Sequence, residues 1–221
     1  MNNILIACEE SQTVLKYFYK NNYNVFSCDL TNFSGPYPER HILADVRTII
    51  NGDAVFTTLD KKSHYIDKWD MIIAFPPCTY FTHASGNRMF YFDKDGIKRL
   101  YQDRYNKMLE YRQLFLDIYY AKCDKICIEN PSPMKICKLP PYSQVIQPYE
   151  FGHPYIKQTC LWLKGLPDLK PTNIITEDLK GYVRNCKKSA IERSKTFDGV
   201  ASAMYEQFSH PGYFEEQLKF F

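Results

Sequence analysis

The sequence predicts an α/β fold, with a mostly parallel, doubly wound sheet in one domain of 221 residues. Short apolar runs with the length of buried strands recur along the chain, and several end on an acidic residue or a proline. Segments with helical periodicity alternate with them, which is the pattern typical of parallel sheets. The length suits a single unit with a substantial core, so we expect one domain over residues 1–221.

The first strand, helix and strand are predicted within the first 29 residues. Residues 3–8 form an apolar run, and residues 11–20 carry an apolar stripe at helical spacing behind Ser11, a candidate N-cap. A second strand is predicted at 24–28 and ends on Asp29. Asp29 follows Cys8 at a spacing close to that at which a Rossmann unit places a carboxylate on a ribose hydroxyl. The alternative for Asp29 is an ordinary turn residue at a strand end.

The turn after the first strand favours a particular kind of cofactor. It reads Cys8-Glu9-Glu10 where a nucleotide-binding unit would have glycines. Two glutamates disfavour a pyrophosphate, and therefore NAD and nucleoside triphosphates. A nucleoside with a cationic end and no phosphate fits better, and S-adenosylmethionine has that description. A third predicted strand ends on Asp45, which is placed to accept from an adenine amino group or to serve a surface turn.

The run at residues 71–75 carries the strongest signal for chemistry. Pro76 and Pro77 stop this strand, and Cys78 follows directly. A thiol on a rigid turn at the carboxyl end of a buried strand is well placed to act as a nucleophile. The alternative is that Cys78, one of eight cysteines, only fills space.

The rest of the chain predicts further elements in order. Residues 48–69 are polar and irregular, with a short helix as an option, and residues 79–97 form a long loop suited to a lid. A helix is predicted at 98–121, and strands at 125–128 and 158–163. The first of these strands stops at Glu129-Asn130-Pro131. Residues 165–195 are loop-like and basic, which indicates a solvated surface or phosphate contacts, and a small-residue helix begins at Gly199.

Composition excludes several classes of protein. A net charge of +3 gives no strong field for a polyanion, although a local basic patch is compatible with it. Aromatic residues make up 16% of the chain, which suits base stacking, an interface or core packing. No run of 18 apolar residues occurs and the amino terminus begins as a strand, so we expect neither a membrane span nor a signal peptide. The cysteines form no Cys-x-x-Cys pair or Cys/His cluster, which predicts a cytoplasmic protein without disulfides or metal.

Four stretches in one order carry a resemblance to a known family. They are residues 75–78 (Phe-Pro-Pro-Cys), 129–131 (Glu-Asn-Pro), 157–162 and 199–204 (Gly-Val-Ala-Ser-Ala-Met). Together they resemble the core motifs of DNA cytosine-5 methyltransferases. More closely, the chain is similar to small phage-encoded methyltransferase-like proteins with an Ala-Cys-Glu-x-Ser-Gln start and a Pro-Pro-Cys-Thr-Tyr core. The resemblance implies a Rossmann-like S-adenosylmethionine-dependent fold, a DNA partner and the host cytoplasm.

The resemblance also implies roles for individual residues. Cys78 would be the nucleophile that attacks C6 of cytosine, and Glu129 would engage the base. S-adenosylmethionine would be bound by Ala7, Cys8, Glu9, Ser11, Asp29, Asp45, Pro76 and Ala201. The substrate would contact Pro77, Thr79, Tyr80, Asn130, Lys157, Thr159 and Arg193. Tyr80 and Phe81 would close over a base that has left its stack, although Thr79, Tyr80 and Asn87 can equally be plain loop residues.

Departures from the family pattern leave alternatives open. Glutamates replace the glycine-rich turn, Pro131 replaces a valine, and Lys157 and Thr159 stand in place of paired arginines. Residues 165–195 can be at most a reduced substrate-recognition segment, too short for a target-recognition domain. The same chemistry on a pyrimidine nucleotide or RNA is therefore a second hypothesis. The third is a degenerate fold that binds nucleic acid or protein. Amine methylation is disfavoured, because Phe75 cannot accept a hydrogen bond from a target amine.

Overall fold

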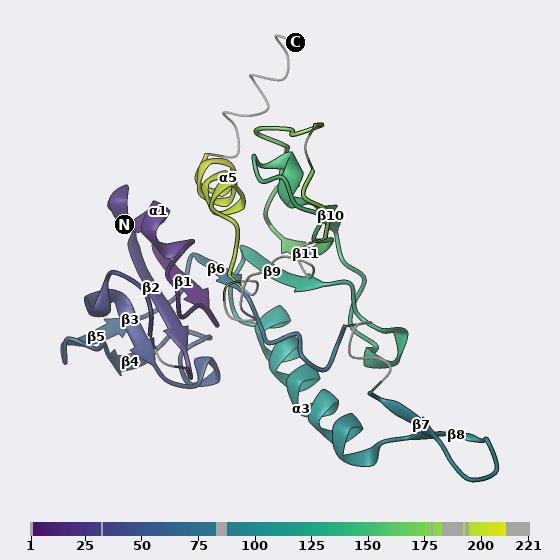
Figure 1. The fold of residues 1–221 in the computed structure, drawn as a ribbon. Helices are drawn as coiled ribbons and strands as arrows, with labels where there is room; N and C mark the ends of the chain where they lie inside the picture. The colour runs from purple at the N-terminus through teal and green to yellow at the C-terminus, as the bar shows by residue number, and fades with distance from the viewer. Residues whose placement is uncertain are drawn as a thin grey trace.

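The central sheet has seven strands in the order β10-β11-β9-β6-β1-β2-β3 (Figure 1). The structure, a computed structural model, describes residues 2–31, 33–82, 88–177, 179–182, 192 and 195–210. The strands are β1 (Asn3–Ala7), β2 (Asn24–Asp29), β3 (His41–Leu43), β6 (Met71–Ala74), β9 (Ile126–Pro131), β10 (Gln144–Ile146) and β11 (Thr159–Lys164). The helices of the described residues are α1 (Leu15–Lys20), α3 (Gln102–Tyr119) and α5 (Asp198–Ser209), with short 3-10 turns η1 (Pro38–Arg40), η2 (Val46–Thr48), η3 (Lys135–Cys137) and η4 (Pro148–Glu150).

Five neighbouring strands, from β3 to β9, are parallel, and β11 and β10 continue the sheet in antiparallel pairs. The predicted α/β class with a mostly parallel sheet is confirmed. From β1 the chain continues to β2 and β3 on one side, and later to β6 and β9 on the other side. The strand order therefore reverses between β1 and β6. Open α/β sheets bind ligands at the carboxyl ends of strands beside such a reversal.

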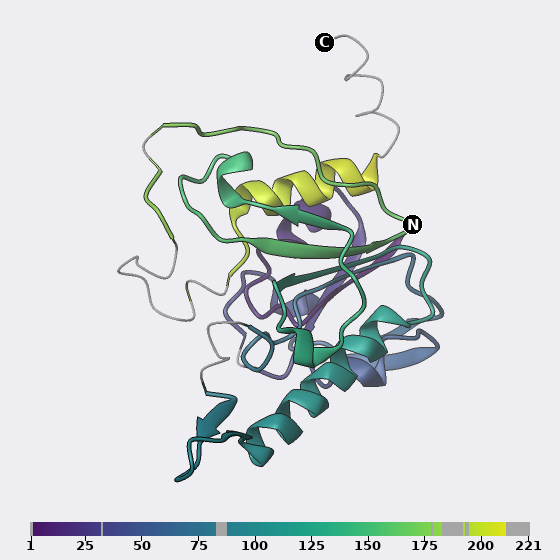
Figure 2. The same ribbon diagram turned by 90° about the vertical axis from the view of Figure 1, so that its right-hand side faces the viewer.

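Helices cover both faces of the sheet, as the doubly wound prediction requires. Figure 2 shows α5 above the sheet and α3 below it. Alternate residues of β1 pack on opposite faces of the sheet. Ile4 and Ile6 pack with α1 and α5, whereas Leu5 and Ala7 belong to the core that includes α3. Because both faces are covered, the central strands are apolar on both sides.

The amino end of α5 is fixed by contacts that only a glycine allows. A Cβ atom at Gly199 would lie 1.9 Å from the carbonyl oxygen of Phe151, which is a backbone atom. The N–H of Gly199 donates to Nε2 of His153 at 2.9 Å. Asp198 also accepts hydrogen bonds from Lys16 and from the Tyr17 hydroxyl, so this end of α5 is tied to α1.

Replacing Gly199 with alanine is expected to lower the free energy of unfolding by about 1–3 kcal/mol, because the added methyl group must displace backbone. The measurement is urea unfolding followed by circular dichroism. Ser202→Ala in the same helix is the control and should change stability by less than about 0.5 kcal/mol. Equal effects of the two substitutions would contradict the close approach of Gly199 to Phe151.

Three predicted segments differ from the structure. Residues 48–69 are not irregular, because they contain a hairpin of β4 (Ala54–Thr57) and β5 (Ser63–Ile66), whose Phe56 stacks on Trp69. The helix predicted at 98–121 begins only at Gln102. The preceding residues form β8 (Lys98–Leu100), which pairs with β7 (Phe90–Phe92). The third is the loop predicted at 79–97, which contains β7.

The turn between β7 and β8 explains the second difference. The carboxylate of Asp93 accepts from the N–H groups of Asp95 and Ile97, and Gly96 adopts φ +73°. These local hydrogen bonds close a hairpin that the alternation of apolar and charged residues does not reveal.

Among the described residues, no helix is long and apolar enough to cross a membrane.

Candidate active site

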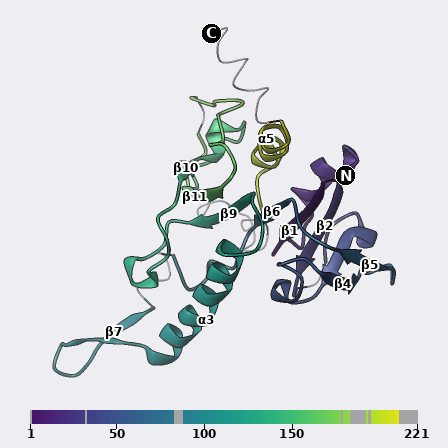
Figure 3. The same ribbon diagram turned by 180° about the vertical axis from the view of Figure 1, so that it is seen from behind.

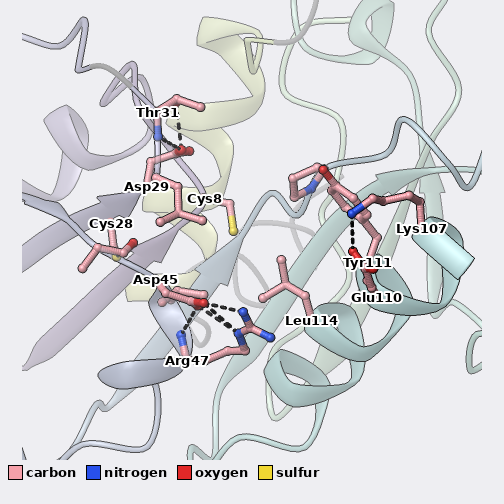
Figure 4. A pocket seen from close by; sticks show the side chains of 14 residues that line it. Cys8, Cys28, Asp29, Thr31, Asp45, Arg47, Lys107, Glu110, Tyr111 and Leu114 are labelled. Atoms are coloured by element: carbon pink, nitrogen blue, oxygen red, sulfur yellow. Dashed lines mark hydrogen bonds and ion pairs between the residues drawn. The ribbon is translucent and has the colours of Figure 1, made fainter.

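A cavity of about 570 Å³ lies at the carboxyl ends of β1, β2, β3 and β6, where the strand order reverses (Figure 4). Cys8 follows β1, Asp29 ends β2, Asp45 follows β3 and Pro77 follows β6, and all four line the cavity. Residues of α3 form the opposite wall. The remaining lining residues are Cys28, Leu30, Thr31, Ala44, Val46, Arg47, Lys107, Glu110, Tyr111 and Leu114.

Cys8 occupies the position where a glycine would be expected. Its φ of +57° lies in the left-handed region, and its N–H donates to the carbonyl of Cys28 at 2.7 Å. Burial raises the pKa of the Cys8 thiol far above its ordinary value, and the nearby Asp29 carboxylate raises it further. Cys8 therefore contributes a neutral thiol to the cavity wall.

Glu9 does not line the cavity, although it was predicted to bind the cofactor. Its buried carboxylate accepts from the N–H of Val14 at 2.6 Å and of Leu15 at 3.3 Å. Glu9 thus satisfies the free donors at the start of α1. The prediction of Ser11 as N-cap is wrong, because the helix begins at Leu15 and the Ser11 hydroxyl is hydrogen-bonded to that of Thr13. Ser11, too, lies outside the cavity lining.

The buried Glu9 carboxyl predicts a pH effect on stability. Burial raises the pKa of Glu9 from 4.5 to about 7, with a smaller contribution from the charge of Glu10. The folded protein therefore holds a proton that the unfolded chain releases as the pH rises above 4.5. The free energy of unfolding should fall between about pH 4.5 and 7, by roughly 3 kcal/mol from this group.

Glu9→Gln should remove that part of the pH dependence, because the amide does not titrate and its oxygen still accepts a hydrogen bond. Urea unfolding of the wild type and the variant at pH 4.5 and pH 8 measures it. Glu206→Gln, on α5, is the control and should leave the wild-type slope in place. An equal slope in wild type and Glu9→Gln would contradict this role of Glu9.

Asp29 and Asp45 both line the cavity, as predicted, but their carboxylates differ in how many oxygens already accept hydrogen bonds. Oδ1 of Asp29 accepts from the N–H and the hydroxyl of Thr31, both at 2.8 Å. Its Oδ2 has no hydrogen-bond partner among the described residues. Both oxygens of Asp45 are bonded to Arg47, and the hydrogen bonds from the Arg47 side chain lower the pKa of Asp45. Asp29 is thus the carboxylate free to receive a ligand.

The other predicted cofactor residues do not line the cavity. Ala7 and Pro76 are buried beside it, and Ala201 lies in the core between α1, α5 and the opposite face of the sheet. Pro77, predicted as a substrate contact, lines the cavity instead. Sequence reasoning missed Arg47 and the α3 residues, because helical periodicity marks a buried face without saying which part faces a cavity.

The segment around Cys78 is held on both sides. The N–H of Phe75 donates to the carbonyl of Ala7 at 2.9 Å, which extends the β1–β6 pairing. The buried Asn130 donates from Nδ2 to the carbonyl of Pro76 at 2.8 Å. After the prolines, the N–H of Phe81 donates to the carbonyl of Cys78 at 3.0 Å and closes a turn. Asn130, predicted to contact the substrate, therefore positions the Pro76–Cys78 turn.

Cys78, Glu129 and Lys157 form a coupled cluster beside the cavity. Burial raises the pKa of the half-buried Cys78 thiol, and the charge of Glu129 raises it further, whereas Lys157 lowers it. Burial likewise raises the pKa of Glu129, and the Lys157 charge and the Thr159 hydroxyl act in the opposite direction. The structure thus brings together four of the predicted site residues: Cys78 after β6, Glu129 in β9, and Lys157 and Thr159 just before and at the start of β11.

A small hollow of about 20 Å³ lies over this cluster, lined by Glu129, Lys157, Thr159 and Phe197 among others. That volume accommodates about one water molecule. The Lys157 ammonium lies 5.9 Å from the centre of the Phe197 ring. A larger group can reach Glu129 from this side only if a wall side chain such as Phe197 moves.

The residues after Cys78 are held by α3. Arg104 donates to the carbonyl of the exposed Thr79 at 3.4 Å, and its guanidinium lies 4.9 Å from the centre of the Tyr80 ring. Tyr80 also packs on Tyr111, which lines the cavity, with ring centres 4.9 Å apart. Arg193, Asn87 and part of the predicted lid lie outside the described residues.

The part of the chain that the structure describes contains neither a metal-binding cluster nor a disulfide bond. No group of three or more potential ligands could hold a metal ion. Seven cysteines in this part are free thiols, Cys8, Cys28, Cys78, Cys123, Cys127, Cys137 and Cys160.

Comparisons with known proteins give distant structural neighbours. No protein-family model matches the chain, and no curated protein matches it. A crystal structure described as a DNA modification methyltransferase encoded within a prophage (E. coli) overlaps at 12% identity and a TM-score of 0.42, covering 79% of this chain and 52% of that one. A mutant of Spodoptera frugiperda DNMT2 overlaps at 14% identity and a TM-score of 0.34, covering 82% and 56%. This chain thus spans little more than half the length of either.

Proposed function

We propose that this protein transfers a methyl group from S-adenosylmethionine to C5 of cytosine in DNA, through a covalent adduct with Cys78. The observation that carries the proposal is the cluster of Cys78, Glu129 and Lys157 at the ends of neighbouring strands, beside a cavity with a free carboxylate. Pro77 lines that cavity and is bonded to Cys78, so a cofactor and a base bound at these places would be adjacent.

The cavity fits a nucleoside with a cationic end. Its volume of about 570 Å³ is ordinary for a small-molecule site. Asp29 offers an unpaired carboxylate oxygen, suited to a ribose hydroxyl or an ammonium group. The two cations of the cavity lining, Arg47 and Lys107, are already paired with Asp45 and Glu110, so a phosphate in this cavity would find no unpaired cation among the described lining residues. Val46 and Leu114 provide apolar surface suited to an adenine ring.

The bound S-adenosylmethionine would supply an electrophilic methyl group on its sulfonium. The Cys78 thiolate would add to C6 of cytosine, which makes C5 nucleophilic. Glu129, protonated more readily than an ordinary carboxyl because its pKa is raised, would donate to N3 and stabilise the electron-rich adduct. Once C5 carries the methyl group, loss of the C5 proton to a base lets the C6–S bond break and returns the thiolate. Lys157 would offset part of the negative charge of the pair.

The cofactor part of the proposal predicts a change in affinity. Asp29→Asn should weaken S-adenosylmethionine binding by about 10- to 100-fold, because a hydrogen bond to a charged acceptor contributes about 1.5–3 kcal/mol. Isothermal titration calorimetry measures it. Asp67→Asn, at an exposed site, should bind like wild type. Unchanged affinity in Asp29→Asn would place the cofactor elsewhere.

The reaction is tested by mass spectrometry of nucleosides after incubation with S-adenosylmethionine and duplex DNA, single-stranded DNA, RNA or dCMP. The proposal expects 5-methylcytosine in DNA. Product in RNA or dCMP alone would assign the second substrate class. If no substrate gives product and calorimetry shows no cofactor binding, the third hypothesis is favoured, in which the protein has this fold but only binds nucleic acid or another protein.

A further inference from the structure

The β7–β8 hairpin and the first turns of α3 project away from the sheet (Figure 1). The same projection is visible from behind (Figure 3). A hydrogen bond from the N–H of Tyr101 to the carbonyl of Met89, at 3.0 Å, extends the β7–β8 pairing to the residue that directly precedes α3. Beyond Tyr101, Arg104 contacts Thr79 and Tyr80, which directly follow Cys78. The projection is therefore connected to the candidate active site by one continuous helix.

Both faces of the hairpin combine an exposed ring with a cation. On one face Phe92 is 71% exposed and pairs across the strands with Lys98, whose ammonium lies 4.3 Å from the centre of the Phe90 ring. On the other face Tyr91 pairs with Arg99 and packs on Tyr101, with ring centres 4.7 Å apart. Exposed apolar side chains that gather on one element mark interaction sites, unlike those scattered singly over a surface.

The projection also holds the charge excess of the chain. Residues 88–107 contain six basic and three acidic residues, and the whole chain has a net charge of +3. The remainder of the chain is therefore balanced. Asp93 pairs with Arg99 at 2.8 Å, whereas no carboxylate among the described residues forms an ion pair with Lys94 or Lys98. Free cations next to exposed rings are the surface on which phosphates and unpaired bases bind together.

We infer that the β7–β8 hairpin binds an unpaired stretch of the nucleic-acid strand that presents the target base to Cys78. Phe92 stacks on a base, and Lys94 and Lys98 contact phosphates. This inference rests on the proposed function for the identity of the ligand, and it adds that the strand is held unpaired outside the catalytic centre. It also gives the chain a substrate-holding element other than residues 165–195.

The test measures binding by fluorescence anisotropy with three labelled probes, a 20-nucleotide single strand, its duplex, and a single strand whose central nucleotides are abasic. Phe92→Ala should weaken binding of the ordinary strand by about tenfold, because it removes the ring on which a base stacks, and should leave the abasic strand unaffected. Lys94→Glu with Lys98→Glu should weaken both single strands by at least about tenfold and reduce the salt dependence.

The β4–β5 hairpin offers matched controls. Tyr65→Ala removes a ring that is 58% exposed, and Lys61→Glu with Lys68→Glu reverses two exposed charges. These variants should bind like wild type. Because all the substituted side chains are exposed, circular dichroism and the unfolding midpoint should stay at wild-type values, which separates binding from folding.

Three results would overturn the inference. One is wild-type affinity in the β7–β8 variants, and another is an equal loss for duplex and single strand. The third is self-association of wild type through the hairpin, seen by sedimentation, with oligonucleotide binding unchanged. Failure of the proposed function looks different, since 5-methylcytosine would be absent while hairpin-dependent binding persisted. Product formed at the wild-type rate by the hairpin variants would contradict the inference alone.

Discussion

Cys78→Ala is expected to reduce methyl transfer by at least about 10³-fold, because it removes the thiol that forms the adduct and activates C5. S-adenosylmethionine affinity should stay within about twofold of wild type, since Cys78 does not line the cavity. Incorporation of a labelled methyl group into DNA, measured with saturating cofactor, gives the rate.

Cys123→Ala is the matched control, because it removes a buried thiol from the connection between α3 and β9. Its rate should remain close to wild type. A Cys78→Ala variant that retains more than about a tenth of the wild-type rate would contradict a covalent mechanism.

Glu129→Gln is expected to slow methyl transfer by about 10²- to 10⁴-fold, the usual contribution of a positioned proton donor. The same substitution should make Cys78 more reactive toward iodoacetamide. The Glu129 charge raises the pKa of Cys78, so its removal lowers that pKa and moves alkylation to lower pH. Peptide mapping by mass spectrometry follows Cys78 separately from the other cysteines.

The opposite directions of these two effects separate a role in catalysis from loss of structure, which would raise the reactivity of every buried cysteine. Glu177→Gln, at an exposed position, should change neither the rate nor the alkylation profile. If Glu129→Gln moved the alkylation of Cys78 to higher pH, the coupling of the two groups would be wrong.

The sequence predicted the frame of the molecule because parallel strands leave a local signature. The runs ending at Pro76 and Glu129 are apolar and the run ending at Asp29 is mostly apolar, as expected for strands covered on both faces. The residues at their carboxyl ends then meet at one edge by topology, which is why Asp29 lies in the cavity and Cys78 lies near Glu129. The helix from Gly199 and the strand before Gly165 were located by the same reasoning.

The sequence did not reveal which hydrogen bonds individual side chains form once the backbone is placed. The sequence suggests that Glu9 is a charged residue in a cofactor-binding turn. In the structure it follows the left-handed backbone at Cys8, and its carboxylate accepts a hydrogen bond from the N–H of Val14 at the start of α1. Asn130 reads as part of a base-binding motif, yet its amide holds Pro76. The β7–β8 hairpin depends on a turn closed by Asp93, and no hydrophobic periodicity reports such a turn.

The central claim is a covalent bond between Cys78 and C6 of cytosine. It is tested most directly with DNA containing 5-fluorocytosine. In this base C5 carries fluorine in place of the proton that must be lost to release Cys78, so the adduct persists. After incubation with S-adenosylmethionine, denaturing mass spectrometry should show a species with the mass of protein, oligonucleotide and methyl group, mapped to Cys78 and absent from Cys78→Ser. An adduct on another cysteine would contradict the account. So would the absence of any adduct on single-stranded and duplex DNA in a protein that binds S-adenosylmethionine.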